Sequence, residues 1–175
     1  MEIVRVITGT LDENCYVLKI DDKCLLIDPG ADADKIKEAM GEAKLLGILV
    51  THAHFDHVGA LREFLKNNRK LMVYKKSNLQ DLVEKEIGPF KFKCYYTPGH
   101  SSDSVSFYFK EANVLFAGDF IFKGTIGRTD LPTGSSTDMQ KSLEKLEEFA
   151  DTTKIYSGHG ELTTLEEERK NNPYL

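Results

Sequence analysis

The sequence predicts an α/β (α+β) fold in which two sheets share a core and helices cover the outside. Three observations support this prediction: the chain opens with short apolar, β-branched runs, alternates such runs with amphipathic segments in its middle, and is β-rich again after residue 90. Runs of the first kind are typical of strands, and the amphipathic segments are typical of helices. A single mixed sheet would fit the same order, and composition alone does not choose between the two arrangements.

The first half of the chain alternates strands with helices. Two apolar runs, 14–20 and 23–28, are joined through Asp21-Asp22 and predict a hairpin. The run 45–50 is apolar throughout, which predicts a strand that is buried on both faces. The other expected elements are a strand at 2–7, a helix at 35–40, a helix carrying Val58, Leu61 and Leu65, and a strand at 70–74.

The second half predicts two helices from capping boxes, Ser77 with Gln80 and Thr137 with Gln140. A third helix is expected to open at Thr164 and to stop before Pro173. The first of these helices would carry Leu79, Leu82 and Val83, and the second would carry Met139, Leu143 and Leu146. The remaining expected elements are strands at 91–96, 104–109, 113–117 and 154–157 and a loop at 118–136.

Length and composition predict one domain, residues 1–175, in the cytoplasm. The net charge of -5 and the scattered basic residues argue against a nucleic-acid or anionic membrane surface. The N-terminal segment lacks the pattern of a signal peptide, and no run has the apolar length of a membrane span. The three cysteines form no C-x-x-C pair and fit buried, reduced thiols: Cys15, Cys24 and Cys94.

All five histidines lie in three short segments, and two aspartates, Asp56 within the first segment and Asp119 after a predicted strand, complete the pattern. Imidazole and carboxylate groups are the ligands that borderline divalent metals prefer. A solvated surface loop is the ordinary alternative for one isolated histidine, but here four candidate ligands crowd into six positions. The sequence therefore predicts a metal site with the candidate ligands His52, His54, Asp56, His57, His100, Asp119 and His159.

Three of these candidates, His52, Asp119 and His159, follow directly after predicted strands. Strands that end at one edge of a core can aim such side chains at a common point. In an extended segment His52 and His54 point to the same side, so both can bind one ion. Asp56 and its neighbour His57 come where the chain turns into a helix, and they can face a second ion.

Two ions a few ångströms apart need a shared carboxylate, and Asp119 is the candidate for it. A water that bridges two such ions loses a proton near neutral pH and becomes a strong nucleophile. Asp56 and Asp119 are the carboxylates assigned to catalysis. Asp28 is expected to support the site by accepting a hydrogen bond from the histidine loop; a plain turn residue is the alternative.

The segment Thr51-His52-Ala53-His54-Phe55-Asp56-His57 resembles the H-x-H-x-D-H signature of the metallo-β-lactamase superfamily. The resemblance implies a four-layer αβ/βα sandwich. It also implies one metal on His52, His54 and His100, a second on Asp56, His57 and His159, and Asp119 between them. The other matching segments, in the expected order, are Asn14-Cys15-Tyr16, Ile27-Asp28-Pro29-Gly30, Thr97-Pro98-Gly99-His100-Ser101, Phe116-Ala117-Gly118-Asp119 and Gly158-His159-Gly160.

Within the superfamily, the chain is most similar to short glyoxalase II-like (hydroxyacylglutathione hydrolase-like) enzymes, through residues 126–132 and the tail from residue 158. The resemblance implies hydrolysis of a thioester such as S-lactoylglutathione by a metal-bridging hydroxide. It implies two divalent ions per chain, with zinc expected and iron or manganese as alternatives. Only 16 residues follow His159, so the C-terminal helical domain through which long glyoxalase II contacts glutathione is expected to be absent.

The substrate is expected to be a small-molecule thioester or another acyl compound, with neither nucleic acid nor membrane as a partner. Arg128 is a candidate for binding a substrate carboxylate through its bidentate fork. An ion pair of Arg128 with Asp130 or another nearby carboxylate is the alternative. The oligomeric state is not readable from the sequence.

A different reaction is also implied, because persulfide dioxygenases resemble this family and share the Gly-Arg-Thr-Asp loop. On that alternative His52, His100 and Asp119 would hold one iron, and His54 would lie outside the coordination sphere. The diiron flavoproteins of the superfamily resemble H-x-E-x-D-H instead, and position 54 is histidine here. Nuclease action is disfavoured by the negative charge and by the lack of an inserted nucleic-acid-clamping domain.

Overall fold

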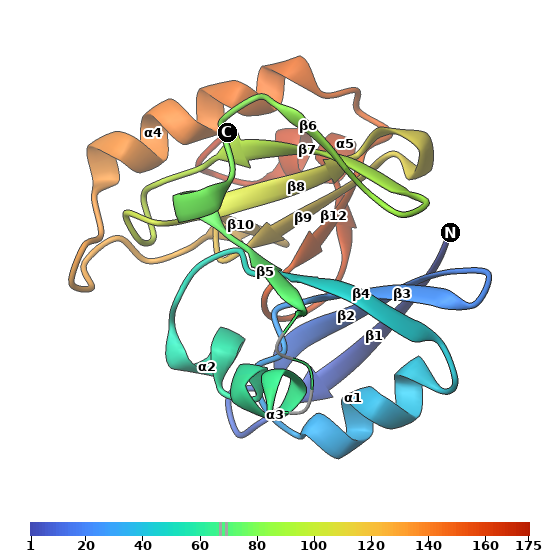
Figure 1. The fold of residues 1–175 in the computed structure, drawn as a ribbon. Coiled ribbons are helices and arrows are strands. Elements are labelled where there is room, and N and C mark those ends of the chain that lie inside the picture. Colours follow the sequence, from blue (N-terminus) through green and yellow to red (C-terminus); the bar gives the residue numbers. More distant parts are fainter. Residues whose placement is uncertain (67, 69) are drawn as a thin grey trace.

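Two sheets lie face to face with helices on their outer faces, in four layers (Figure 1). The computed structural model describes residues 1–66, 68 and 70–175. This arrangement confirms the predicted αβ/βα sandwich and excludes the single mixed sheet. No helix in the described part of the chain is long and apolar enough to cross a membrane.

The first sheet has five strands in the order β1-β2-β3-β4-β5. Its first three strands are antiparallel, and the β3–β4 and β4–β5 pairs are parallel. Helix α1 covers its outer face together with two short helices, α2 and α3. The bounds are β1 (Glu2–Thr8), β2 (Glu13–Ile20), β3 (Lys23–Ile27), α1 (Ala33–Met40), β4 (Lys44–Leu49), α2 (Phe55–Val58), α3 (Leu61–Leu65) and β5 (Met72–Tyr74).

The second sheet has six strands in the order β13-β12-β9-β8-β7-β6, and helices α4 and α5 cover its outer face. Strands β9 and β12 run parallel, whereas the other neighbours are antiparallel. The bounds are β6 (Glu84–Ile87), β7 (Phe90–Tyr96), β8 (Val105–Phe109), β9 (Val114–Gly118), α4 (Ser136–Glu144), β12 (Lys154–Ser157), β13 (Thr163–Thr164) and α5 (Leu165–Asn171). A separate hairpin pairs β10 (Ile121–Phe122) with β11 (Thr125–Ile126).

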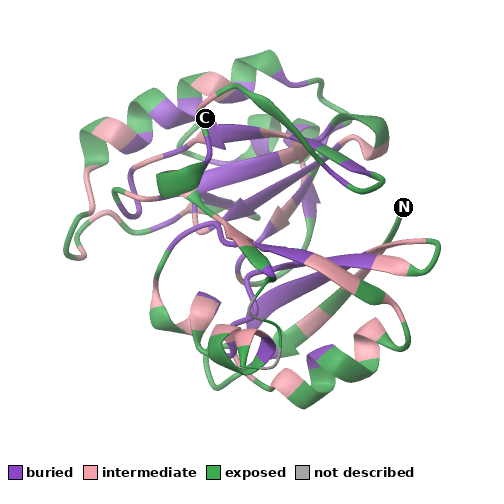
Figure 2. Ribbon diagram, viewed as in Figure 1, coloured by how far each residue is buried: buried purple, intermediate pink, exposed green. Residues whose placement is uncertain are grey.

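Three layers of apolar side chains hold the sandwich together, and strand β2 shows how one strand serves two of them. Successive side chains of a strand point to opposite faces. Tyr16 and Leu18 therefore pack between the sheets, while Cys15 and Val17 pack under the outer helices. Figure 2 shows the same pattern in the ribbon, with buried strands inside and exposed helix faces outside.

The three cysteines are free and buried, as the sequence predicts: Cys15, Cys24 and Cys94. Burial raises the pKa of the Cys24 thiol to about 11 and that of Cys94 to about 12. At neutral pH these thiols are protonated, so they serve as small apolar side chains of the core.

The predicted helix of Leu79, Leu82 and Val83 is wrong. A single 3₁₀ turn, η1 (Lys76–Asn78), stands there, and the chain continues into strand β6. The backbone N–H of Leu82 donates to Cys94 O (2.8 Å), and residues 84–87 pair with β7. Pairing with a distant strand therefore overrides the local helix signal of Ser77 and Gln80.

Three smaller predictions also need correction. The helix of Val58, Leu61 and Leu65 is broken into α2 and α3, because the N–H of Ala60 is directed to Pro29 O and Gly30 O instead of continuing one helix. The cap of α4 is Ser135 rather than Thr137, and the η3 turn (Lys145–Glu148) carries Leu146 beyond the end of α4. The expected loop at 118–136 contains the β10–β11 hairpin.

Candidate metal centre

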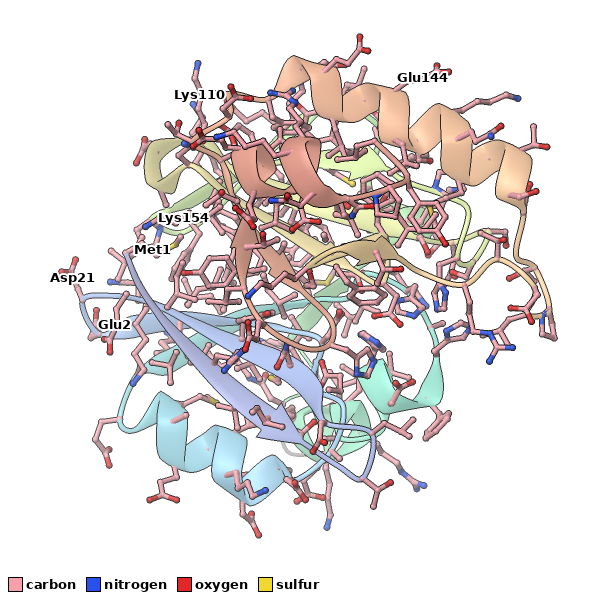
Figure 3. The ribbon with its side chains drawn as sticks, turned by 180° about the vertical axis from the view of Figure 1, so that it is seen from behind. Met1, Glu2, Asp21, Lys110, Glu144 and Lys154 are labelled. Carbon is pink, nitrogen blue, oxygen red and sulfur yellow. The ribbon has the colours of Figure 1, made fainter. Side chains whose placement is uncertain are left out.

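The histidine-bearing segments meet at one edge of the sandwich, where the strands that precede them end. Strand β4 leads into His52, β9 into Asp119 and β12 into His159, while His100 lies in the loop between β7 and β8. Figure 3 shows how densely side chains fill the space between the two sheets. The ligand-type atoms form overlapping groups within 4.8 Å, and together these groups contain all seven candidates that the sequence nominates: His52, His54, Asp56, His57, His100, Asp119 and His159.

The first group consists of three histidines. Nδ1 of His54 lies 3.0 Å from Nε2 of His52 and 2.9 Å from Nε2 of His100. Burial, together with the neighbouring imidazoles, lowers the pKa of His52 to about 2. A neutral imidazole is the form that binds a metal, so the environment of His52 favours the ligand form.

The second group combines Asp56, His57 and His159. Oδ2 of Asp56 lies 3.2 Å from Nε2 of His159 and 3.9 Å from Nε2 of His57. The side chain of His57 is fully buried, while that of Asp56 is partly exposed. This group therefore has one face in the protein and one face toward solvent.

Asp119 lies between the two groups. Its Oδ1 is 3.3 Å from Nε2 of His57, and its Oδ2 is 3.4 Å from Nε2 of His100 and 3.7 Å from Nε2 of His159. Burial raises the pKa of this carboxyl, but the neighbouring histidines, His57 first and then His52 and His159, more than offset the effect, so the pKa lies below its usual range. Asp119 is thus a carboxylate that contacts both histidine groups.

The donor set fits divalent metal ions. Nε2 of His57 and Oδ1 of Asp119 are buried in the described structure without a hydrogen-bond partner, although they lie 3.3 Å apart. Buried polar atoms without partners are costly and rare, and a shared cation would satisfy both. Imidazole nitrogens with carboxylate oxygens suit zinc, iron or manganese.

Hydrogen bonds made by Nδ1, the ring nitrogen that faces away from the cluster, orient three of the imidazoles. His57 Nδ1 lies 2.9 Å from Asp28 Oδ2, His100 Nδ1 donates to Arg128 O (2.8 Å), and His159 Nδ1 donates to Leu11 O (3.0 Å). Each contact leaves Nε2 free to face the cluster, which is how outer partners select the tautomer of a metal ligand. His52 has the same arrangement, since its Nδ1 lies 3.1 Å from the hydroxyl of Thr51.

Asp28 is buried and contacts the histidine loop at both ends. Its Oδ1 accepts from the backbone N–H of Thr51 (2.7 Å), and its Oδ2 accepts from the Thr51 hydroxyl (2.5 Å). With the contact to His57, the carboxylate receives three hydrogen bonds. Asp28 therefore ties the start of the loop to the start of α2.

Gly158 allows the backbone to approach the cluster closely. A Cβ at this position would lie 2.3 Å from Oδ1 of Asp119 and 2.6 Å from Cε1 of His57. Real Cβ atoms do not come so close to other heavy atoms, so any side chain at position 158 would displace two candidate ligands.

Glu13, a buried carboxyl on β2 behind His57, is not among the residues that the sequence nominates. Its Oε2 accepts from the Thr8 hydroxyl (2.7 Å), and its Oε1 lies 3.9 Å from Nδ1 of His57 without a hydrogen bond. Burial, together with the charge of Asp28, raises the pKa of Glu13 to about 9. No local pattern marks this side chain as buried, since β2 also carries the polar residues Asn14 and Lys19.

Arg128 is exposed and paired with Asp130. Its Nε and Nη2 donate to the two carboxylate oxygens of Asp130, both at 2.7 Å. This is the pairing that the sequence left open as the alternative to a carboxylate-binding role. The backbone of Arg128, rather than its guanidinium, contacts a metal-ligand candidate, His100.

A pocket of about 700 Å³ opens onto the cluster. Four candidate ligands, His54, Asp56, His100 and Asp119, line its floor. Leu11 and Phe55 lie on its wall, as do Arg128, Leu131 and Pro132. A small molecule in this pocket would therefore contact both histidine groups.

Known proteins resemble the chain over its whole length. It is 36% identical to a probable metallo-hydrolase of Bacillus subtilis, over 98% of this chain and 96% of that protein. It is 29% identical to a hydroxyacylglutathione hydrolase of Haemophilus influenzae, over 100% of this chain and 98% of that protein.

Two solved structures share its fold. A structure described as the BLEG-1 B3 metallo-beta-lactamase matches with a TM-score of 0.93 and 33% identity, over 99% of each chain. TTHA1623 in a di-iron-bound form matches with a TM-score of 0.87 and 32% identity, over 98% of this chain and 100% of that one. The family model of the metallo-beta-lactamase superfamily matches residues 8–76 and 74–159. The chain therefore belongs to the metallo-beta-lactamase superfamily.

Proposed function

We propose that the protein is a dinuclear metallohydrolase that cleaves thioesters such as S-lactoylglutathione. The observation that carries the proposal is the position of Asp119, which lies near His100 of the first ligand group and near His57 and His159 of the second. A carboxylate between two ligand groups is what a two-metal site requires. The likeness to a hydroxyacylglutathione hydrolase supports the thioester as substrate.

Seven side chains would hold the ions. His52, His54 and His100 would bind the first, Asp56, His57 and His159 the second, and Asp119 both. Two divalent ions would supply Lewis acidity toward the substrate carbonyl and lower the pKa of a bound water. Zinc is the expected ion; the di-iron form of a similar structure supports iron as the first alternative, and manganese is the other.

The protein's own contribution is to position and shield these ligands. Asp28, Leu11 and Arg128 hold three imidazoles through their Nδ1 atoms, so that the Nε2 atoms converge. The burial of His57 and His52 keeps solvent from the inner side of the cluster. Asp56 and Asp119 line the open pocket, so a bound substrate can meet their carboxylates there.

We also propose a substrate class and a cellular location. A small-molecule acyl substrate fits the pocket of about 700 Å³ on the cluster. Three buried free thiols are compatible with the reducing cytoplasm as the location.

The test is turnover of a substrate panel by protein loaded with zinc, iron or manganese. The panel contains S-lactoylglutathione, other thioesters and a β-lactam, because one similar structure is described as a B3 metallo-beta-lactamase. We expect thioester cleavage, and its loss in His57→Ala and Asp119→Ala. Asp34→Asn on the exposed face of α1 is the matched control and should retain activity. Full activity of both alanine variants would contradict the two-metal mechanism.

A persulfide dioxygenase is the second candidate, and His54 discriminates between the two. That reaction would use one iron on His52, His100 and Asp119, with His54 outside the coordination sphere. The contacts of 3.0 Å and 2.9 Å between His54 and the other two histidines favour three nitrogen ligands, as in the hydrolase. Oxygen uptake by iron-loaded protein with glutathione persulfide would support the dioxygenase, and no uptake would remove it.

A further inference from the structure

We propose that the substrate carries an uncharged hydrocarbon chain beside its thioester, and that Leu11 and Phe55 hold this chain. The inference rests on the proposed thioester hydrolysis and narrows its substrate class: among thioesters it favours those with an uncharged hydrocarbon chain over S-lactoylglutathione, whose glutathione part carries carboxylates. Its basis is the wall of the metal-centre pocket, which combines exposed apolar side chains with charged groups that are already paired.

Leu11 and Phe55 are exposed beside the candidate ligands. Phe55 is 73% exposed, although it lies between His54 and Asp56 in the chain, and Leu11 is 51% exposed. Large apolar side chains gathered at a cleft indicate a ligand or partner that covers them. Leu131 and Pro132 also line the pocket and add to its apolar surface.

The charged groups of the wall offer little to an anionic substrate. Apart from the candidate ligands, the charged side chains among the described lining residues are Asp103 and Arg128. The carboxylate of Asp103 accepts from the N–H of Ala53 (3.1 Å) and the hydroxyl of Ser101 (2.6 Å). The guanidinium of Arg128 is held by Asp130 through two hydrogen bonds of 2.7 Å. A substrate carboxylate on this wall would meet only the remaining Nη1 donors of a guanidinium whose charge Asp130 already balances.

A second pocket, of about 480 Å³, adjoins the first across the same side chains. Leu11, Phe55 and Asp56 line both pockets. The hydrocarbon chain of a substrate at the metal centre can therefore pass along Phe55 from one pocket to the other. Half of the residues that line the second pocket are small and leave room for a hydrocarbon. Besides the candidate ligand Asp56, its acidic side chain is Asp32, which is paired with Lys35. Its small lining residues are Gly9, Gly30, Ala31, Ala33, Gly59 and Ala60.

The first experiment measures kcat/KM of zinc-loaded protein for acetyl, butyryl and hexanoyl thioesters of N-acetylcysteine methyl ester, which is a neutral thiol. The same acyl groups on N-acetylcysteine, which carries a free carboxylate, form the matched charged series. We expect kcat/KM to rise about fourfold per added methylene, the factor that corresponds to transfer of one methylene from water. We also expect a loss of kcat/KM in the charged series. Equal kcat/KM for the acetyl, butyryl and hexanoyl thioesters, or a preference for the charged series, would overturn the inference.

The second experiment changes the wall. Phe55→Ala should lower the ratio of kcat/KM for hexanoyl over acetyl by about tenfold, because it removes part of the apolar contact and leaves Leu11, Leu131 and Pro132 in place. Phe55→Leu should restore much of that ratio. Met72→Ala is the control, since Met72 on β5 is similarly exposed (52%) but lines neither pocket. A ratio that is unchanged in Phe55→Ala would contradict the assignment.

Binding of inert thioethers separates this inference from the proposed function. S-hexyl and S-ethyl N-acetylcysteine methyl ester are compared by calorimetry in the wild type and in Phe55→Ala. Tighter binding of the hexyl compound, lost in the variant, supports the apolar wall even if no thioester is cleaved. A lack of thioester cleavage would then contradict only the proposed hydrolysis. Equal binding of the two thioethers would overturn the inference whatever the turnover.

Discussion

Oδ2 of Asp28 lies 2.9 Å from Nδ1 of His57, and both side chains are buried. The residues are 29 positions apart in the chain, so this contact joins the end of β3 to the helix that follows the histidine loop. It orients the ring so that Nε2 faces Asp119 at 3.3 Å. Replacement of Asp28 should therefore affect the metal centre without removing any candidate ligand.

Asp28→Asn should weaken metal binding by about ten- to hundredfold, the usual effect of losing an outer partner of a metal ligand. The carboxylate accepts three hydrogen bonds, and an amide would turn an NH₂ group toward one of those donors. Competition with a chromophoric chelator measures the affinity. Asp34→Asn is the exposed control and should bind like the wild type. Unchanged affinity in Asp28→Asn would refute the positioning role.

Gly158→Ala should reduce metal occupancy while the protein still folds. The added Cβ would meet Asp119 Oδ1 and His57 Cε1, so one or both side chains must move. Metal content after dialysis measures the occupancy, and circular dichroism reports the fold. Gly41→Ala is the control, because its φ of 59° costs stability but a Cβ there has no atom within 4 Å. Normal metal content in Gly158→Ala would show that the cluster tolerates the displacement.

Glu13 should make the metal-free protein less stable as the pH rises. Its pKa is raised from 4.5 to about 9, so across this window the native state holds a proton that the unfolded state has released. The free energy of unfolding must then fall with increasing pH, and the fall is complete above about pH 9.

Glu13→Gln tests this directly, because glutamine does not ionise and resembles the neutral acid. Urea unfolding of chelator-treated protein from about pH 5 to about pH 9 should show a smaller loss of stability in the variant than in the wild type. Glu38→Gln on the exposed side of α1 should keep the wild-type profile. A Glu13→Gln profile parallel to that of the wild type would contradict the raised pKa.

Much of the sandwich is predictable from local pattern. Strands such as 14–20 and 113–117 are mainly apolar on both faces, and this pattern is independent of what they pair with. The candidate ligands were predictable for a related reason, since each segment that carries them begins just beyond a strand end or a sharp turn, where the backbone leads to the sheet edge.

What the sequence did not reveal depends on contacts between distant segments. Strand β6 is a polar Glu-Lys-Glu-Ile run, and it becomes a strand because β7 pairs with it. The burial of Glu13 follows from the layers packed around β2, which no local pattern reports. The ion pair of Arg128 and Asp130 was one of two open alternatives, because spacing alone does not tell whether a loop arginine points to its neighbour or to a substrate.

Titration of metal-free protein with zinc, with thioester hydrolysis followed at each addition, tests the central claim most directly. The two ligand groups and the shared Asp119 predict that activity rises to a break at two equivalents of zinc per chain. A break at one equivalent, or no hydrolysis at any zinc content, would contradict the dinuclear hydrolase.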